Sequence, residues 1–168
     1  YKGNKVGSQG LAQVFSLSPT KVLTSGEGGI IATNNDDLAE QLRWMVEWGH
    51  KGDYNTILPG LNGRMSEIHA LVGYESLLII KNLLEKRNAQ VSLYKETLNN
   101  EYFSFQEIQE DSKSTFKDFA IIPTYIETRE NRDNLINYLN ASGINVKVYF
   151  DPPIHTHDFY KNHNFNNL

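Results

Sequence analysis

The sequence predicts a mixed α/β fold. The prediction rests on three observations. Apolar runs of strand length, such as residues 11–15 and 30–33, stand beside a helical pattern over residues 34–49. A much longer helical pattern follows between residues 66 and 99. From about residue 100 the chain changes again, to short strand patterns around one further helix.

Composition excludes several classes of protein. The 168 residues include 39% hydrophobic and 11% aromatic residues, enough for a core in one domain or in parts of two. The net charge of -4 argues against nucleic-acid binding, and no apolar run is long enough to cross a membrane. The absence of cysteine excludes disulfides and thiolate metal sites and favours a cytoplasmic location.

The segment with the strongest indication of a reactive site is FSLSPTKVLTSGEGG, residues 15–29. It presents one lysine, Lys21, among Ser, Thr, Pro and Gly. A sheltered lysine amine can form an imine with an aldehyde, and nearby hydroxyls and loop amides can bind a phosphate. These are the parts of an anchor for pyridoxal phosphate. The alternative from composition alone is an exposed lysine without a function.

The helices are predicted from their caps and their apolar spacing. Asn34 or Asn35 caps the first helix, and Gly49 is expected to end it. Ser66 begins a second helix, and a third is expected to follow it over residues 77–98. The charged residues of the third helix are interpreted as a solvated face.

The last third of the chain is predicted as strands around one helix. Residues 102–105 and 116–122 have strand character, Thr128 opens a helix and Gly143 closes it. Residues 144–150 alternate between apolar and polar side chains, which predicts another strand.

Four motifs occur in a set order: FSLSPTK, TSGEGG, PGLNGRMSEIHALVG and VYFDPPIH. In this order they resemble the DegT/DnrJ/EryC1/StrS family of sugar aminotransferases, which are fold-type I enzymes that use pyridoxal phosphate on nucleotide-linked ketosugars. The resemblance implies that residues 1–76 end the large cofactor-binding α/β domain. It also implies that residues 77–99 form a bridging helix and that residues 100–168 form an incomplete small α+β domain. The resemblance further implies that the chain is a segment of a larger enzyme, because the family's aspartate at the pyridine nitrogen lies upstream of the region that matches Tyr1.

The resemblance also implies roles for single residues. Lys21 corresponds to the lysine that holds the cofactor as an internal aldimine and moves the proton. Ser16 corresponds to a serine on the cofactor phosphate; its alternative is a strand-end serine bonded to nearby backbone. Asn62 corresponds to an asparagine that reaches the phosphate in the partner of a homodimer; its alternative is a turn asparagine. Glu27 is read as a structural carboxylate rather than a catalytic acid.

Tyr149 and His155 are hypothetical substrate contacts, because family members often carry a similar stretch near the mouth of the active site. The alternative for His155 is a hydrogen-bonded loop histidine. His157 and His163 lie close by in the sequence, yet no third ligand accompanies them, so no metal site is predicted.

The predicted function is transfer of an amino group from an amino acid, by family habit glutamate, to a nucleotide-linked ketosugar. Two alternatives stay open. A related sugar dehydratase keeps the cofactor but has histidine in place of the lysine, so Lys21 favours aminotransfer. The segment could also be a catalytically incompetent domain or a dimerisation module.

Overall fold

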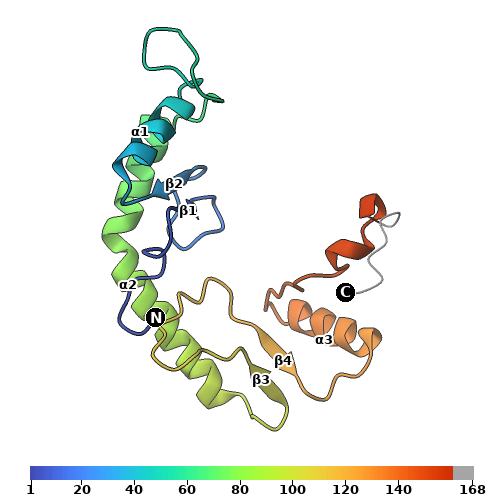
Figure 1. The fold of residues 1–168 in the computed structure, drawn as a ribbon. Helices are drawn as coiled ribbons and strands as arrows, with labels where there is room; N and C mark the ends of the chain where they lie inside the picture. The colour runs from blue at the N-terminus through green and yellow to red at the C-terminus, as the bar shows by residue number, and fades with distance from the viewer. Residues whose placement is uncertain (161–168) are drawn as a thin grey trace. The chain divides into compact units, whose positions relative to one another are not determined.

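The computed structural model describes residues 1–160 and divides the chain into two compact units, Tyr1–Ile122 and the part from Pro123 onward. Figure 1 labels the helices and strands. In chain order they are β1 (Gln13–Ser16), β2 (Gly29–Ala32), α1 (Asp36–Met45), α2 (Glu67–Thr97), β3 (Phe103–Phe105), β4 (Ile121–Pro123) and α3 (Arg129–Ala141). Two 3₁₀ turns follow, η1 (Ile154–Thr156) and η2 (Asp158–Tyr160). This mixture of helices and strands confirms the α/β prediction.

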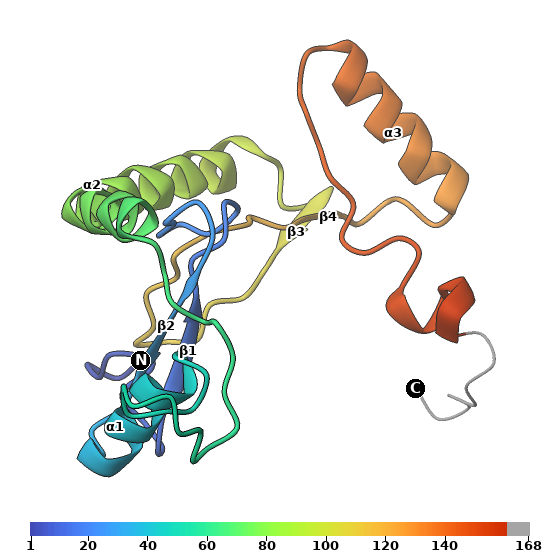
Figure 2. The same cartoon turned by 90° about the horizontal axis from the view of Figure 1, so that it is seen from above.

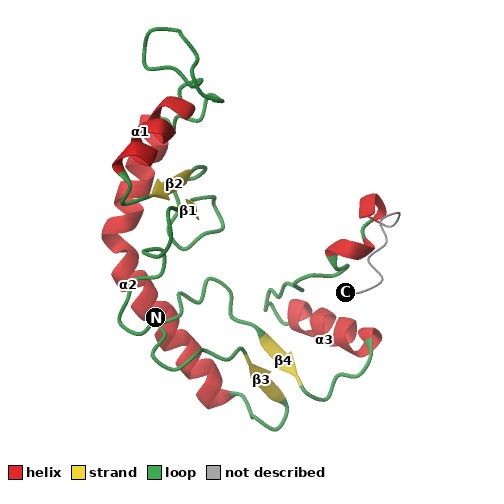
Figure 3. Ribbon diagram, in the orientation of Figure 1, coloured by secondary structure: helices red, strands yellow, loops and turns green. Residues whose placement is uncertain are grey.

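β1 and β2 form an antiparallel ribbon in which Gln13 pairs with Ala32 and Ser16 with Gly29. The expectation of a buried strand at residues 30–33 is wrong for this chain, because Ile30 and Ile31 are 46% and 43% exposed. The ribbon has only two strands, so no third strand among the described residues covers its apolar side chains. Figure 3 shows how much of the chain around the ribbon is loop.

α1 begins at the predicted cap. The side chain of Asn35 accepts a hydrogen bond from the Leu38 amide at 2.8 Å, and Asp36 and Asp37 follow in the first turn. The helix ends at Met45, earlier than the predicted stop at Gly49. Gly49 instead turns the chain after the helix, with a φ of 79° and its amide bonded to the Trp44 carbonyl at 2.7 Å.

α2 is one continuous helix of 31 residues, not the two helices that the sequence predicted. Gly73 lowers helix propensity by only about 1 kcal/mol relative to alanine, too little to break a helix of this length. Only Val91 is buried along it, whereas Ile68 and Ile79 are 76% and 62% exposed. An apolar helix surface of this kind is normally covered by other protein.

The core of the first unit lies at the C-terminal half of α2. Val91 and Phe116 are buried there, and the ring of Phe119 stacks on Phe105 at 5.6 Å between centroids. The guanidinium of Arg87 donates to the Phe116 carbonyl at 2.9 Å and ties this loop to the helix. β3 and β4 pair as a small sheet and are shorter than the predicted strands at 102–105 and 116–122.

The second unit is built around α3. Thr128 caps the helix by accepting from the Asn131 amide at 3.2 Å, and Gly143 follows its end with a φ of 79°, as predicted. The predicted strand at residues 144–150 is wrong, because the structure assigns no strand there. An alternating sequence gives a strand one apolar face, but it does not provide the neighbouring strand that its backbone must pair with. No neighbouring strand in the described part of the chain completes the hydrogen bonding.

Candidate functional site

The lysine-bearing loop, residues 18–24, is closed at its base by one buried residue. Leu17 is 3% exposed, and its amide extends the β1–β2 pairing by donating to the Gly28 carbonyl at 2.9 Å. The Leu17 carbonyl accepts from the Ser25 amide at 3.0 Å and from the Thr24 hydroxyl at 3.1 Å. The amide and the carbonyl of Leu17 are therefore both hydrogen-bonded to residues that follow the loop or end it. These bonds hold the start of the loop against its end.

A tight turn places Lys21 within this loop. The Lys21 amide donates to the Ser18 carbonyl at 3.0 Å, with Pro19 at the second position, where its fixed φ favours a turn. Lys21 is half-buried. Ser16 ends β1 just before the loop that carries Lys21. The Ser16 hydroxyl oxygen is 3.4 Å from that of Ser18 and also accepts from the Ser18 amide at 3.5 Å.

The loop is packed against the start of α2. Ser25 is fully buried, and a methyl group on Gly73 of α2 would lie only 3.3 Å from the Ser25 Cβ. One helical turn earlier, the ring of His69 faces Gly26, because a methyl group on Gly26 would lie 3.3 Å from the His69 Cδ2 atom. Figure 2 shows the loop that joins β1 and β2 next to the start of α2. Gly73 allows the close approach, so the helix supports the lysine loop from behind.

The residues of this loop fit pyridoxal phosphate. Three hydroxyls, on Ser16, Ser18 and Thr20, stand in the five positions before Lys21, and the turn adds backbone amides. Hydroxyls and amides are suitable donors to a phosphate, and a primary amine is what the cofactor's aldehyde requires.

Asn62 lies in the connection between α1 and α2, on an exposed surface. The backbone there pairs with the chain that leaves α1, through an antiparallel bridge between Glu47 and Asn62. The Asn62 side chain contacts Arg64, which forms an ion pair with Glu47. The predicted role of Asn62 requires a second copy of the chain and remains a prediction.

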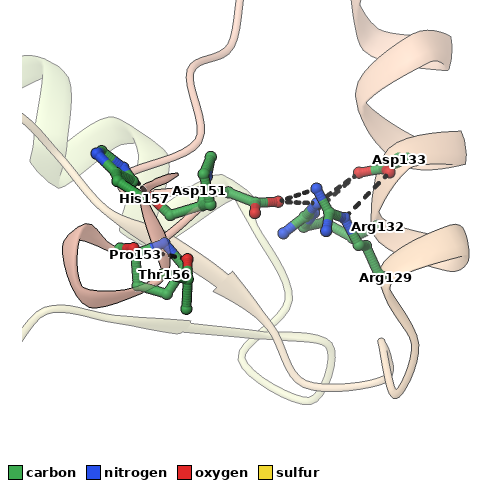
Figure 4. A network of polar contacts seen from close by, with 8 residues as sticks. Arg129, Arg132, Asp133, Asp151, Pro153, Thr156 and His157 are labelled. Carbon is green, nitrogen blue, oxygen red and sulfur yellow. Dashed lines mark hydrogen bonds and ion pairs between the residues drawn. The ribbon is translucent and has the colours of Figure 1, made fainter. Parts of the chain in front are cut away.

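Tyr149 and His155 lie in the second unit, and both are exposed. Figure 4 shows the contacts that hold their segment. The carboxylate of Asp151 pairs with Arg132 at 2.5 Å and with Arg129 at 3.1 Å, both from α3. Hydrogen bonds to Asp133, the larger effect, and to Asp151 raise the pKa of Arg132. The guanidinium therefore stays charged over the whole usable pH range.

His155 sits in η1 beside this cluster, and the neighbouring His157 ring lies 3.1 Å from the Pro152 carbonyl. His163 lies outside the described residues. Among residues 1–160 no group of three or more acidic or histidine side chains is arranged to hold a metal ion. None of the helices in that range combines the length and apolar content needed to cross a membrane.

Sequence reasoning missed two sets of residues around these sites. The first is Ser25 and His69, which pack the loop on α2; Gly73 inside a helical pattern indicates a close approach of a neighbour, but not that the neighbour is Ser25. The second is the cluster of Arg129, Arg132, Asp133 and Asp151. The sequence shows the i, i+3 spacing of the two arginines, but it does not show that both pair with Asp151, which lies 19 residues after Arg132.

A model of the DegT/DnrJ/EryC1/StrS aminotransferase family matches residues 1–167. A UDP-4-amino-4,6-dideoxy-N-acetyl-beta-L-altrosamine transaminase from Campylobacter jejuni is 32% identical over 166 residues, which cover 96% of this chain and 44% of that protein. The crystal structure of a DegT DnrJ EryC1 StrS aminotransferase from Brucella abortus is 29% identical, with a TM-score of 0.83 over 96% of this chain and 42% of that one.

A third similar protein is DesV of S. venezuelae, solved by X-ray crystallography in complex with a ketimine intermediate. It is 26% identical, with a TM-score of 0.85 over 97% of this chain and 43% of that one. The chain therefore spans less than half the length of each of these relatives.

Proposed function

Because this chain belongs to the DegT/DnrJ/EryC1/StrS aminotransferase family, we propose that it is part of a sugar aminotransferase that uses pyridoxal phosphate. The amino group passes from an amino acid, with glutamate as the expected donor, to a nucleotide-linked ketosugar. The observation that carries this proposal is the closed loop that holds the half-buried Lys21, with the hydroxyl of Ser16 bonded to Ser18 at the start of that loop.

The roles of the residues follow from their chemistry. The Lys21 amine would hold the cofactor through its aldehyde carbon, and once the amino donor had taken its place, the freed amine would accept the proton of the donor's α-carbon. The Ser16 hydroxyl donates to the phosphate. When bound, pyridoxal phosphate supplies an electron sink for the negative charge that develops at that α-carbon.

Two further parts of the proposal concern contacts outside the lysine loop. Asn62 is exposed, and its carboxamide can donate to a phosphate without adding charge, which suits a role at the cofactor of a second copy in a homodimer. Tyr149 and His155, on the segment held by Asp151, are proposed to contact the nucleotide sugar. We also propose that residues 1–76, 77–99 and 100–168 correspond to the large domain, the bridging helix and the small domain.

The test uses the full-length gene product with its cofactor. Borohydride reduction is expected to fix pyridoxal phosphate on the peptide that contains Lys21, detected by mass spectrometry. The variant Lys21→Ala is expected to lose this attachment and aminotransfer together. Lys81→Ala, on an exposed position of α2, is the matched control and is expected to retain both.

Product analysis with a ketosugar distinguishes the chemical alternatives. An amino sugar that incorporates nitrogen from labelled glutamate supports the proposal, whereas a deoxy sugar without that nitrogen identifies a dehydratase. A Lys21→Ala variant that transfers amino groups at the wild-type rate refutes the role of Lys21.

A further inference from the structure

Arg64 is held on three sides, although it lies on an exposed loop. Its guanidinium pairs with the Glu47 carboxylate at 3.0 Å and lies over the ring of Trp48, 4.9 Å from the centroid. Its Nε donates to the Oδ1 atom of Asn62 at 3.4 Å. Arg64 is therefore a fixed group whose third contact is the side chain proposed to bind the cofactor phosphate.

The backbone around Asn62 is fixed independently of Arg64. The Leu61 amide donates to the Met45 carbonyl at 2.9 Å, and the Gly63 amide donates to the Val46 carbonyl at 3.0 Å. The Trp48 amide donates back to the Leu61 carbonyl at 3.2 Å. A change at Arg64 therefore leaves these backbone bonds in place and acts on the direction of the Asn62 side chain.

The contact decides which way the carboxamide points. All hydrogen-bonding groups of a guanidinium are donors, so the group that faces Arg64 must be the carboxamide oxygen. The NH₂ group of Asn62 then points away from Arg64 with its donors available. A phosphate accepts hydrogen bonds and repels a carbonyl oxygen, so this orientation is the one that an anion requires.

We propose that Arg64 is a positioning residue for the cofactor phosphate: clamped by Glu47 and Trp48, it holds the Asn62 carboxamide with its NH₂ group outward. This inference rests on the proposed function, and it adds the residues that orient the Asn62 carboxamide so that it can donate to a phosphate. Glu47 has two effects, since it fixes Arg64 and neutralises its charge.

The competing arrangement is direct binding of the phosphate by Arg64, and Glu47 separates the two. If Arg64 acts through Asn62, Glu47→Gln releases the guanidinium and weakens cofactor binding. If Arg64 binds the phosphate itself, the same substitution removes a competing carboxylate and leaves binding equal or tighter.

The experiment measures the dissociation constant of pyridoxal phosphate by titrating the full-length apo-protein and following the absorbance of the bound cofactor. Arg64→Gln is expected to raise this constant roughly tenfold, as expected when a charge-assisted contact is lost. Glu47→Gln is expected to raise it several-fold. The matched control is Lys51→Gln in the same loop, since Lys51 lies over the Trp44 ring at 4.0 Å, and it is expected to bind as the wild type does.

A double variant tests the route of the effect. Asn62→Ala with Arg64→Gln is expected to bind no worse than Asn62→Ala alone, because a positioning residue loses its effect when its target is absent. Additive losses overturn the proposal, and so does equal or tighter binding by Glu47→Gln. Circular dichroism of each variant identifies any loss that arises from unfolding.

Failure of this inference is distinguishable from failure of the proposed function. If the wild type attaches pyridoxal phosphate at Lys21 while Arg64→Gln binds it unchanged, only the positioning role is refuted. If the wild type does not attach the cofactor at Lys21, the proposed function itself is refuted.

Discussion

The two regions proposed to meet cofactor and substrate are held in different ways. The lysine loop is closed by backbone hydrogen bonds at Leu17 and by the close packing of Ser25 on Gly73. The segment that carries Tyr149 and His155 is instead tied to α3 by the ion pairs of Asp151 with Arg129 and Arg132. One region depends on steric fit, and the other depends on charge.

The difference determines what can loosen each region. Buried backbone hydrogen bonds and close packing respond little to salt. Ion pairs between partly exposed groups are screened by salt and contribute modestly to stability. We infer that the lysine loop is the more rigid of the two regions and that the segment around His155 is the more adjustable. Substitutions should therefore affect cofactor attachment and substrate binding separately.

The largest expected effect comes from removing the side chain that closes the lysine loop. Leu17→Ala deletes a side chain that is 3% exposed and leaves a cavity, at a cost of about 2–4 kcal/mol in the free energy of unfolding. Borohydride-fixed cofactor at Lys21 should fall in parallel. Denaturant unfolding and mass spectrometry of the full-length protein measure the two effects.

The control for this substitution lies three residues earlier, on β1. Val14 is 76% exposed, so Val14→Ala is expected to change the free energy of unfolding by about 0.5 kcal/mol or less. Equal losses in the two variants would contradict the view that Leu17 closes the loop.

The same comparison explains how far the sequence could predict the structure. Local signals were sufficient for the caps at Asn35, Ser66 and Thr128, because capping depends on a side chain and an amide three residues away. The lysine loop was also predictable as a loop, since Pro19 and the glycines after Ser25 restrict it directly. The family resemblance then supplied the interpretation of Lys21.

The failures all involved partners distant in the sequence. The alternation at residues 144–150 predicted a strand, but a strand needs a neighbour, and the sequence could not show that none is paired there among the described residues. Gly73 indicated a close approach, but its contact could not be named, because Ser25 lies 48 positions earlier. The partners of Asp151 were missed for the same reason, since periodicity reports only the element in which a residue lies.

The next effect in size concerns the charged region. Asp151→Asn removes the carboxylate that both arginines share, so the segment with Tyr149 and His155 should lose its fixed position. The KM for the nucleotide sugar is expected to rise several-fold, with cofactor attachment at Lys21 unchanged. High salt should raise the wild-type KM toward that of the variant, because it screens the same ion pairs.

A matched charge change distinguishes position from net charge. Glu130→Gln also removes one negative charge, in the first turn of α3 on an exposed residue, and is expected to leave the KM unchanged. Since its hydrogen bonds to Asp133 and Asp151 raise the pKa of Arg132, this guanidinium keeps its charge throughout the pH range of an activity assay. Deprotonation of Arg132 therefore cannot produce a KM change near neutral pH; a KM that is insensitive to Asp151→Asn would contradict the proposed role of the cluster.

The smallest effect compares two helix caps of the same chemical type. The Ser66 hydroxyl accepts from the His69 amide at 3.3 Å and lies 2.7 Å from the His69 ring, whose edge faces Gly26 at the base of the lysine loop. The Thr128 hydroxyl caps α3, in the charged region. Ser66→Ala and Thr128→Ala should each cost about 1 kcal/mol in the free energy of unfolding, because each leaves one helix amide without its acceptor.

The two cap variants should nevertheless differ at the cofactor. Ser66→Ala also frees the His69 ring, so the support behind Gly26 weakens and the dissociation constant of pyridoxal phosphate should rise about two- to threefold, the factor that roughly 0.5 kcal/mol represents. Thr128→Ala should leave that constant unchanged despite an equal loss of stability. If both variants weaken cofactor binding equally, the effect follows global stability. The packing of α2 against the lysine loop would then have no separate part in holding the cofactor.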